Sequence, residues 1–193
     1  MINIAIFASG SGTNAERLFE KFAQHPQGRV AVLLTNNPQA GVIARAERFG
    51  VPVVVFTKQD LTTTDAVLTH LQEHAVDLVV LAGFLLKIPP KLIHAYPDRI
   101  VNLHPALLPA YGGKGMYGRH VHEAVVAAGD TKSGISIHYV NEHYDEGRML
   151  LQVSCPVDPG DSPEDVATKV HRLEHQYYPE VVEELVATFP TGQ

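Results

Sequence analysis

The sequence predicts an α/β protein with an open, mostly parallel, twisted sheet and helices on both faces. Apolar runs of strand length alternate with longer segments of helical period, and the order through the first half is β-α-β-α-β-α-β. Several runs, such as Leu78-Val79-Val80-Leu81, are apolar at every position, which is typical of strands covered on both faces. The 193 residues correspond to a single domain.

Seven strands and five helices account for these runs. The expected strands are residues 2–8, 29–35, 52–56, 77–82, 99–103, 134–140 and 149–155. The expected helices are residues 14–25, 40–49, 64–75, 119–128 and 163–187. The segment 112–118, Gly-Gly-Lys-Gly-Met-Tyr-Gly, is too rich in glycine for regular structure and predicts a mobile loop.

Composition narrows the class of protein. The formal net charge is −6, from 15 basic and 21 acidic residues, whereas nucleic-acid binders usually carry a basic surface. Cys155 is the only cysteine, so no intrachain disulfide can form. No apolar run approaches the roughly 20 residues that span a bilayer, and the first residues lack the features of a signal peptide. We therefore expect a cytoplasmic protein without nucleic-acid or membrane partners.

The first candidate site follows the first strand, where Ser9-Gly10-Ser11-Gly12-Thr13-Asn14-Ala15 opens a helix. Ligands of open parallel sheets bind beyond the carboxyl ends of the strands, and a helix N-terminus offers free N–H groups to a phosphate. A side chain at Gly12 is expected to block the close approach of that ligand. A dinucleotide site needs an acidic residue about 20 positions later, and the second strand ends instead in Leu34-Thr35-Asn36-Asn37. The alternative to a phosphate site is a tight turn that only caps the helix.

The second candidate site follows the fifth strand, in Val101-Asn102-Leu103-His104-Pro105. Asn102 and His104 are two residues apart, so on a strand they share one face. Histidine exchanges protons near neutral pH, and an asparagine amide can donate to an oxyanion. We expect Asp145 to lie near His104 and to raise the pKa of the histidine. The alternatives are a structural histidine and an acidic surface turn.

A third pattern, His171-Arg172-Leu173-Glu174-His175, matches the H-x-x-E-H motif of inverted zinc proteases. Only 18 residues follow His175, which leaves little room for the distant carboxylate ligand of such enzymes. We therefore expect no metal.

Six segments, in order, resemble the glycinamide ribonucleotide formyltransferases, a folate-dependent family of purine synthesis. They are Ala8-Ser9-Gly10-Ser11-Gly12-Thr13-Asn14, Leu81-Ala82-Gly83-Phe84, Asn102-Leu103-His104-Pro105-Ala106-Leu107-Leu108-Pro109, Gly134-Ile135-Ser136-Ile137-His138, Asp145-Glu146-Gly147, and Glu174-His175 before Tyr178-Pro179. The resemblance implies a Rossmann-like formyltransferase fold and formyl transfer from 10-formyltetrahydrofolate to the amine of glycinamide ribonucleotide, without a metal.

The resemblance also implies roles for individual residues. Asn102, His104 and Asp145 are expected to be catalytic, with His138 in support. The ribonucleotide is expected to bind Gly12, Thr13, Asn14, His171 and Glu174. The formylfolate is expected to bind Leu85, Leu86, Lys87, Ile88, Asn102, Asn141, Glu142, His143, Tyr144 and Asp145. Within one domain of residues 1–193, residues 1–100 form a phosphate-binding half and residues 101–193 a catalytic and folate-binding half, in a monomer or homodimer.

The chain departs from the common family pattern at Ala106, where serine is frequent, and at Lys87, one position later than the usual basic residue. The loop 110–119 looks some four residues longer than usual, and we expect a lid or an interface. Methionyl-tRNA formyltransferase carries an extra C-terminal domain and formylfolate hydrolase an N-terminal one, so the length of this sequence disfavours both. A catalytically idle binding module is disfavoured because binding alone does not require the three polar residues at the strand ends.

Overall fold

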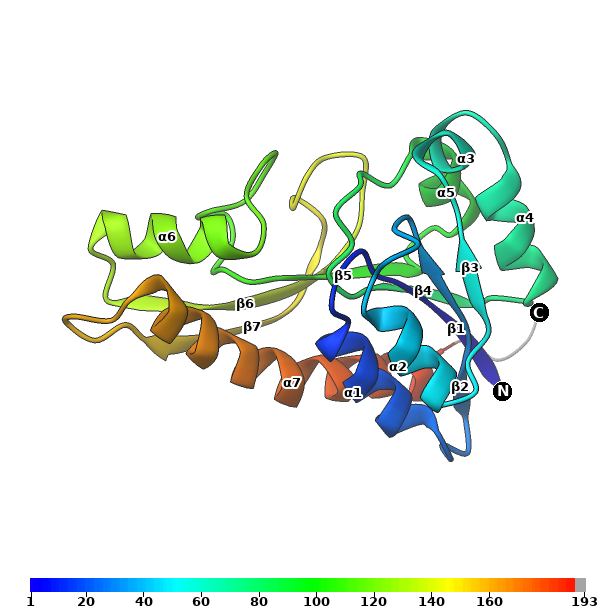
Figure 1. Ribbon diagram of the computed structural model, residues 1–193, viewed down its shortest axis with the longest axis horizontal. Coiled ribbons are helices and arrows are strands. Elements are labelled where there is room, and N and C mark those ends of the chain that lie inside the picture. The colour runs from blue at the N-terminus through cyan, green and yellow to red at the C-terminus, as the bar shows by residue number, and fades with distance from the viewer. Residues whose placement is uncertain (190–193) are drawn as a thin grey trace.

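The computed structural model describes residues 1–189, which form a seven-stranded sheet in the order β3-β2-β1-β4-β5-β6-β7 (Figure 1). The strands are β1 Ile2–Phe7, β2 Gly28–Thr35, β3 Val53–Val55, β4 Leu78–Leu81, β5 Ile100–His104, β6 Lys132–Tyr139 and β7 Met149–Pro156. The helices are α1 Thr13–Phe22, α2 Val42–Arg48, α3 Lys58–Thr62, α4 Ala66–Glu73, α5 Pro90–Ala95, α6 Arg119–Ala128 and α7 Pro163–Ala187.

The first five strands pair in parallel, while β6 and β7 add to the edge in antiparallel orientation. In the register, Phe7 pairs with Leu81 and Leu81 with Asn102. The carboxyl ends of β1, β4 and β5 therefore lie side by side, and the loops that follow them leave the sheet together. The predicted open, mostly parallel sheet is confirmed.

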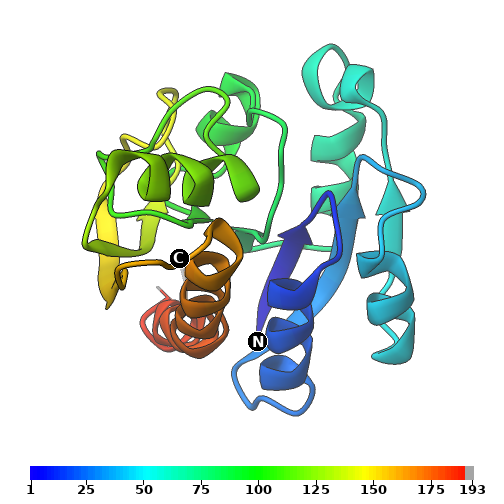
Figure 2. The same ribbon diagram turned by 60° about the vertical axis from the view of Figure 1, so that its left-hand side comes forward.

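Helices cover both faces of the sheet, as Figures 1 and 2 show. One apolar cluster joins β1 and β4 to α1, α2 and α7, and extends to α6 through Val125. A second cluster, on the other face, joins the same strands to α3, α4 and α5. The strands are consequently apolar on both sides, and the four residues of β4 are all buried.

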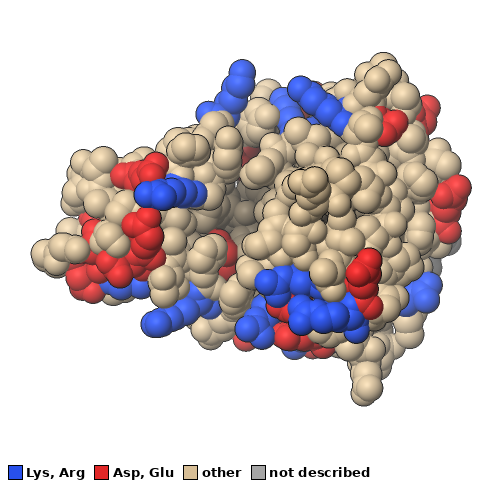
Figure 3. Space-filling model, in the orientation of Figure 1, with Lys and Arg blue, Asp and Glu red and all other residues tan. Residues whose placement is uncertain are grey.

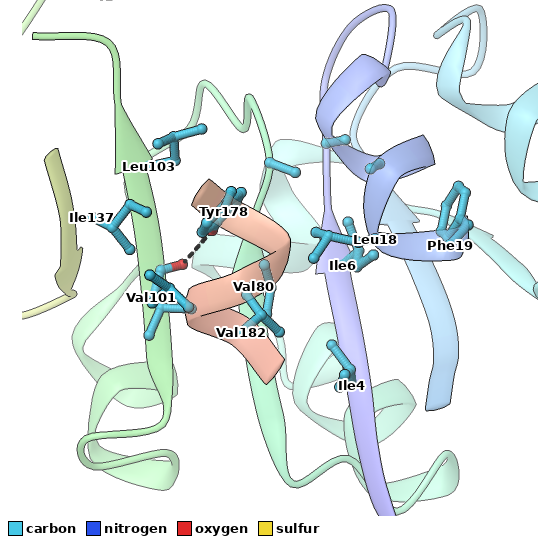
Figure 4. Packing of buried hydrophobic residues seen from close by; sticks show 14 of the residues in the cluster. Ile4, Ile6, Leu18, Phe19, Val80, Val101, Leu103, Ile137, Tyr178 and Val182 are labelled. Atoms are coloured by element: carbon cyan, nitrogen blue, oxygen red, sulfur yellow. Dashed lines mark hydrogen bonds between the residues drawn. The ribbon is translucent and has the colours of Figure 1, made fainter. Parts of the chain in front are cut away.

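The long helix α7 is anchored against two central strands. Tyr178 is fully buried, and its hydroxyl donates to the carbonyl of Leu81 at 2.8 Å. The hydroxyl also donates to the carbonyl of Val101 at 3.4 Å, as Figure 4 shows. Leu81 is the last residue of β4, and Val101 directly precedes Asn102 in β5. The helix therefore holds a fixed position relative to the residues that follow those strands.

The structure adds two short helices to the predicted set, α3 and α5. Each has six residues or fewer, too few to show a helical period. α3 does carry a readable start signal, because Thr57 and Asp60 form a capping box. Residues 110–118 form an irregular connection before α6, as predicted. Within residues 1–189, no helix is both long enough and apolar enough to cross a membrane.

Candidate active site

β5 and β6 bring three polar side chains to one place. Asn102 and His104 follow the alternation of β5, in which Val101 and Leu103 turn to the apolar core. The antiparallel register pairs Asn102 with His138, and Nδ2 of Asn102 lies 3.3 Å from Nε2 of His138. Nδ1 of His138 lies 2.9 Å from the carbonyl of Tyr139, which can only accept. His138 thus donates from Nδ1 and accepts from Asn102, leaving the second amide proton of Asn102 free.

Asp145 comes to the same place from the turn between β6 and β7. One carboxylate oxygen lies 3.8 Å from Nδ1 of His104, and the other lies 3.6 Å from Nε2 of His138. The backbone N–H of Gly113 donates to Asp145 at 2.8 Å. The predicted proximity of Asp145 to His104 is confirmed, and the glycine-rich loop contributes to holding the carboxylate.

The expected direction of the His104 pKa is wrong. Burial lowers the pKa of His104, and the nearby carboxylate of Asp145, which raises it, only partly offsets this effect. Burial of Asp145 by itself raises the pKa of that carboxyl, but the nearby imidazoles of His138 and His104 and the hydrogen bond from the N–H of Gly113 together lower it. The resting pair is therefore a neutral imidazole beside a carboxylate.

A backbone contact determines which nitrogen of His104 carries the proton. Nε2 of His104 lies 2.7 Å from the carbonyl oxygen of Tyr111. Because that oxygen can only accept, Nε2 is the donor and Nδ1 is unprotonated in the neutral ring. Tyr111 adopts φ +55° and its hydroxyl donates to Asp130 at 2.5 Å. The basic nitrogen of His104 thus faces Asp145.

The loop after β1 forms the second part of the site. Gly12 has φ +77° and precedes α1, which begins without a side-chain cap. The first backbone N–H with an intrahelical acceptor is that of Glu16, which donates to Gly12, so the N–H groups of the first turn remain available. A Cβ atom on Gly12 would lie 2.3 Å from Cγ2 of Val42. Gly12 is therefore required by the fold itself, and its expected role in the close approach of a ligand stays a prediction.

α7 joins this loop through a buried carboxylate. Oε2 of Glu174 accepts from Nδ2 of Asn14 and from Nδ1 of His171, both at 2.8 Å. Burial alone raises the pKa of Glu174, yet His171 and Asn14 lower it overall, while the hydrogen bond to Glu174 raises the pKa of His171. Among residues 1–189, no group of three or more His, Cys, Asp or Glu side chains is arranged to hold a metal ion.

One cavity of about 690 Å³ contains nearly all of these residues. The predicted residues that line it are Gly12, Thr13, Asn14, Leu85, Leu86, Lys87, Ile88, Asn102, His104, His138, Asn141, His143, Tyr144, Asp145, His171 and Glu174. Figure 3 shows this face hollowed between the part that carries α6 and the larger part that carries α1 and α2. Lys87 and Tyr144 meet within it, with Nζ 5.1 Å from the ring centre.

Glu142 is the predicted folate-binding residue that this cavity lining does not include. Its exposed side chain pairs with His94 of α5 at 2.8 Å instead. The resemblance implied the whole run 141–145 and made no distinction between the two sides of that turn.

Sequence reasoning assigned no role to several lining residues, namely Gly83, Phe84, Lys114, Met116 and Tyr117. Gly83 and Phe84 lie two and three residues after the end of β4, so the rule that ligands bind beyond strand ends could have identified them. Lys114 and Tyr117 lie in the long loop after β5, for which the glycine-rich composition predicted irregular structure but no ligand contact.

Known proteins are similar to this chain over most of its length. A family model described as formyl transferase matches residues 2–182. The phosphoribosylglycinamide formyltransferase of Bacillus subtilis is 34% identical over 198 residues, covering 100% of this chain and 99% of that protein. The crystal structure of glycinamide ribonucleotide transformylase 1 from Geobacillus kaustophilus gives a TM-score of 0.86 at 37% identity, covering 96% of this chain and 99% of that one.

Plant relatives are longer. The chloroplastic phosphoribosylglycinamide formyltransferase of Arabidopsis thaliana is 43% identical over 185 residues, which cover 93% of this chain and 63% of the plant protein. The corresponding share of the Vigna unguiculata enzyme is 60%. The chain therefore spans less than two thirds of the length of these two relatives. The family model, by contrast, matches most of this chain. This chain belongs to the formyl transferase family.

Proposed function

We propose that this protein transfers the formyl group of 10-formyltetrahydrofolate to the amine of glycinamide ribonucleotide, giving formylglycinamide ribonucleotide in purine biosynthesis. The observation that carries the proposal is one continuous cavity lined both by the helix-opening loop 10–14 and by Asn102, His104 and Asp145. A phosphate at the loop and a reacting amine at the histidine fit the two ends of a ribonucleotide. The names of the Bacillus and Geobacillus relatives agree with this substrate.

The reaction begins with the attack of the substrate amine on the formyl carbon. Negative charge then develops on the formyl oxygen, and the free amide proton of Asn102 stabilises it. Nδ1 of His104, unprotonated at rest, takes up the proton that the amine loses, and Asp145 at 3.8 Å stabilises the resulting imidazolium. The imidazolium then stabilises the formyl oxygen by a hydrogen bond and keeps its proton. When the C=O bond re-forms and the bond from the formyl carbon to the folate nitrogen breaks, that proton passes from His104 to the folate nitrogen, and the ring returns to neutral.

Binding is divided between the two ends of the cavity. The free N–H groups of Thr13 and Asn14 at the start of α1 are suited to the phosphate, and Glu174 is suited to the ribose hydroxyls. Leu85 to Ile88, with Asn141, His143 and Tyr144, form the mostly apolar region suited to the folate. Holding both substrates in register contributes much of the rate, up to roughly 7–11 kcal/mol in favourable cases.

The proposal is tested by following the absorbance change of the folate. Turnover is expected only when the formyl donor and glycinamide ribonucleotide are both present. His104→Ala is expected to keep its fold and lose on the order of 10²–10³ in kcat, as for other lost oxyanion donors. Binding of both ligands without turnover in the wild type would favour an idle binding module, and near-normal turnover of His104→Ala would remove His104 from the mechanism.

The small-molecule partners under this proposal are the ribonucleotide and the formylfolate. A monomeric or homodimeric state, a cytoplasmic location, the lack of nucleic-acid and membrane partners, and the division into halves at residue 100 stay predictions from the sequence.

A further inference from the structure

Two carbonyl groups of the loop before α1 are held on the side that faces α2. The carbonyl of Gly10 accepts from the backbone N–H of Val42 at 3.1 Å. The carbonyl of Ser11 accepts from Nε of Arg45 at 2.8 Å. In the described part of the chain, the cavity lining includes residues 10–14 and no residue of α2. The carbonyls therefore point away from the cavity.

The N–H groups of the same peptides must point the other way. In a planar trans peptide, the carbonyl of one residue and the N–H of the next lie on opposite sides. The N–H groups of Ser11 and Gly12 are thus directed away from α2, to the side of the cavity. Together with the free N–H groups of the first turn of α1, they form a concave set of donors of the kind that binds anions.

We propose that Arg45 is a positioning residue that fixes the peptide between Ser11 and Gly12, so that the N–H of Gly12 faces the substrate phosphate. This inference rests on the proposed function. The peptide of Gly10 is held by another backbone group, whereas the carbonyl of Ser11 is held by this one side chain. The carbonyl of Ser11 belongs to the peptide that joins Ser11 to Gly12. Because Gly12 has no Cβ, its dihedral angles are less restricted than those of other residues. Arg45 supplies the constraint that the backbone lacks.

The chain provides a matched control for this role. Glu16 of α1 pairs with Nη1 of Arg45 through one oxygen and with Nη2 of Arg48 through the other. Both arginines lie on α2 and bring the same charge to the same carboxylate. Arg45 also bonds the loop, and its side chain is 27% exposed, against 63% for Arg48. Loss of either arginine removes one positive charge and one ion pair between α2 and Glu16 of α1. Only loss of Arg45 also removes the hydrogen bond to the loop peptide.

The kinetic test compares Arg45→Ala with Arg48→Ala. Arg45→Ala is expected to raise the KM for glycinamide ribonucleotide about tenfold, because a misoriented N–H is lost from phosphate binding in the ground state and transition state alike. Its kcat and its KM for the formyl donor are expected to stay within about twofold. Arg48→Ala is expected to change none of these by more than about twofold. Equal effects of the two variants, or a rise in both KM values for Arg45→Ala, would overturn the assignment.

A second measurement reports the peptide directly and does not need turnover. In ¹⁵N amide spectra, ribose 5-phosphate is expected to shift the Gly12 resonance of the wild type and of Arg48→Ala, and to shift it much less in Arg45→Ala. If Arg45→Ala does not fold, Arg45→Gln takes its place, since it retains much of the side-chain packing. A Gly12 resonance that does not respond in the wild type, or responds equally in the Arg45 variant, refutes the positioning role. A wild type that passes this test but transfers no formyl group refutes the proposed function alone.

Discussion

His104 is subject to two opposing influences, burial and the carboxylate of Asp145. The place of Asp145 after a predicted strand indicated the second and led to the expectation of a raised pKa, but the pKa is lowered because His104 is only 4% exposed. A residue's burial depends on what covers it, here the segment around Tyr111 that binds Nε2. Chemical type and strand position could be read from the sequence, but the electrostatic balance could not.

The pH dependence of the reaction tests this balance. In the proposed mechanism neutral His104 accepts the amine proton, so kcat/KM is expected to fall as pH drops through the pKa of His104, which lies below its ordinary value of 6.5. Asp145→Asn removes the nearby charge that raises this pKa, so the acid limb moves to still lower pH while kcat falls. Full pH profiles of both proteins provide the measurement. A limb that moves to higher pH in Asp145→Asn contradicts the assignment.

Two glycines of the loop after β1 have different reasons for being glycine. A Cβ on Gly12 collides with Val42 at a positive φ, whereas a Cβ on Gly10 meets no atom within 4 Å and Gly10 lines the cavity. Gly12→Ala is expected to lower the free energy of unfolding by about 1–3 kcal/mol. Gly10→Ala is expected to fold normally and to raise the KM for the ribonucleotide. Urea unfolding and steady-state kinetics separate the two, and equal loss of stability in both variants would show that the difference is not local.

At the scale of elements, one helical turn of α7 carries both a residue of the candidate site and a residue of the core. Glu174 lines the cavity, and the hydroxyl of Tyr178, four residues later, donates to the carbonyls of Leu81 in β4 and Val101 in β5. Residues four apart lie on the same face of a helix. The position of Glu174 relative to the strand ends is therefore set by the buried tyrosine.

Tyr178→Phe is expected to lower the free energy of unfolding by about 1–2 kcal/mol, because a buried hydrogen bond to the strand carbonyls is lost. The neighbouring Tyr177, half-buried, allows the same substitution as a control, with an expected change within about 0.5 kcal/mol. Denaturant titration measures both. If the two variants lose equal stability, the hydroxyl of Tyr178 does not anchor the helix.

Helices and strands with long hydrophobic patterns were predicted more accurately than short ones. α6 and α7 begin and end at the predicted residues, and the seven strands differ by two residues or fewer at each end. α3 and α5 were missed because they are shorter than two helical turns. The antiparallel register that places His138 opposite Asn102 depends on contacts 36 residues apart, which no local pattern encodes. The resemblance to known formyltransferases supplied His138 and the folate-binding residues instead.

At the scale of the whole molecule, buried histidines couple stability to pH. His122 is 3% exposed, its Nδ1 has no hydrogen-bond partner among the described residues, and burial and the nearby His171 lower its pKa despite Glu174. A lowered pKa in the folded state means that the unfolded chain binds the proton more readily below pH 6.5. The contribution of His122 to stability is therefore present at pH 7.5 and is lost as the pH falls.

We expect the free energy of unfolding to fall less between pH 7.5 and pH 5.5 in His122→Gln than in the wild type. His171, whose pKa is raised, acts in the opposite direction in both proteins. The exposed neighbour His120 provides the control, since His120→Gln removes an imidazole of the same helix. Urea unfolding at the two pH values measures the difference. An unchanged dependence in His122→Gln would show that this ring does not titrate on folding.

The cavity is assembled from segments spread over the entire chain, from Gly10 to Glu174. The hydrogen bond from Asn14 to Glu174 alone joins residues 160 positions apart. When the protein refolds after dilution from denaturant, turnover is thus expected to return only after the slowest of these long-range contacts has formed. Helices and single strands form earlier and do not by themselves restore turnover. A fragment ending at residue 100 retains the proposed anion-binding loop without Glu174 of α7, the hydrogen-bond partner of Asn14. Inactive but compact refolding intermediates are accordingly expected to bind phosphate before they regain turnover.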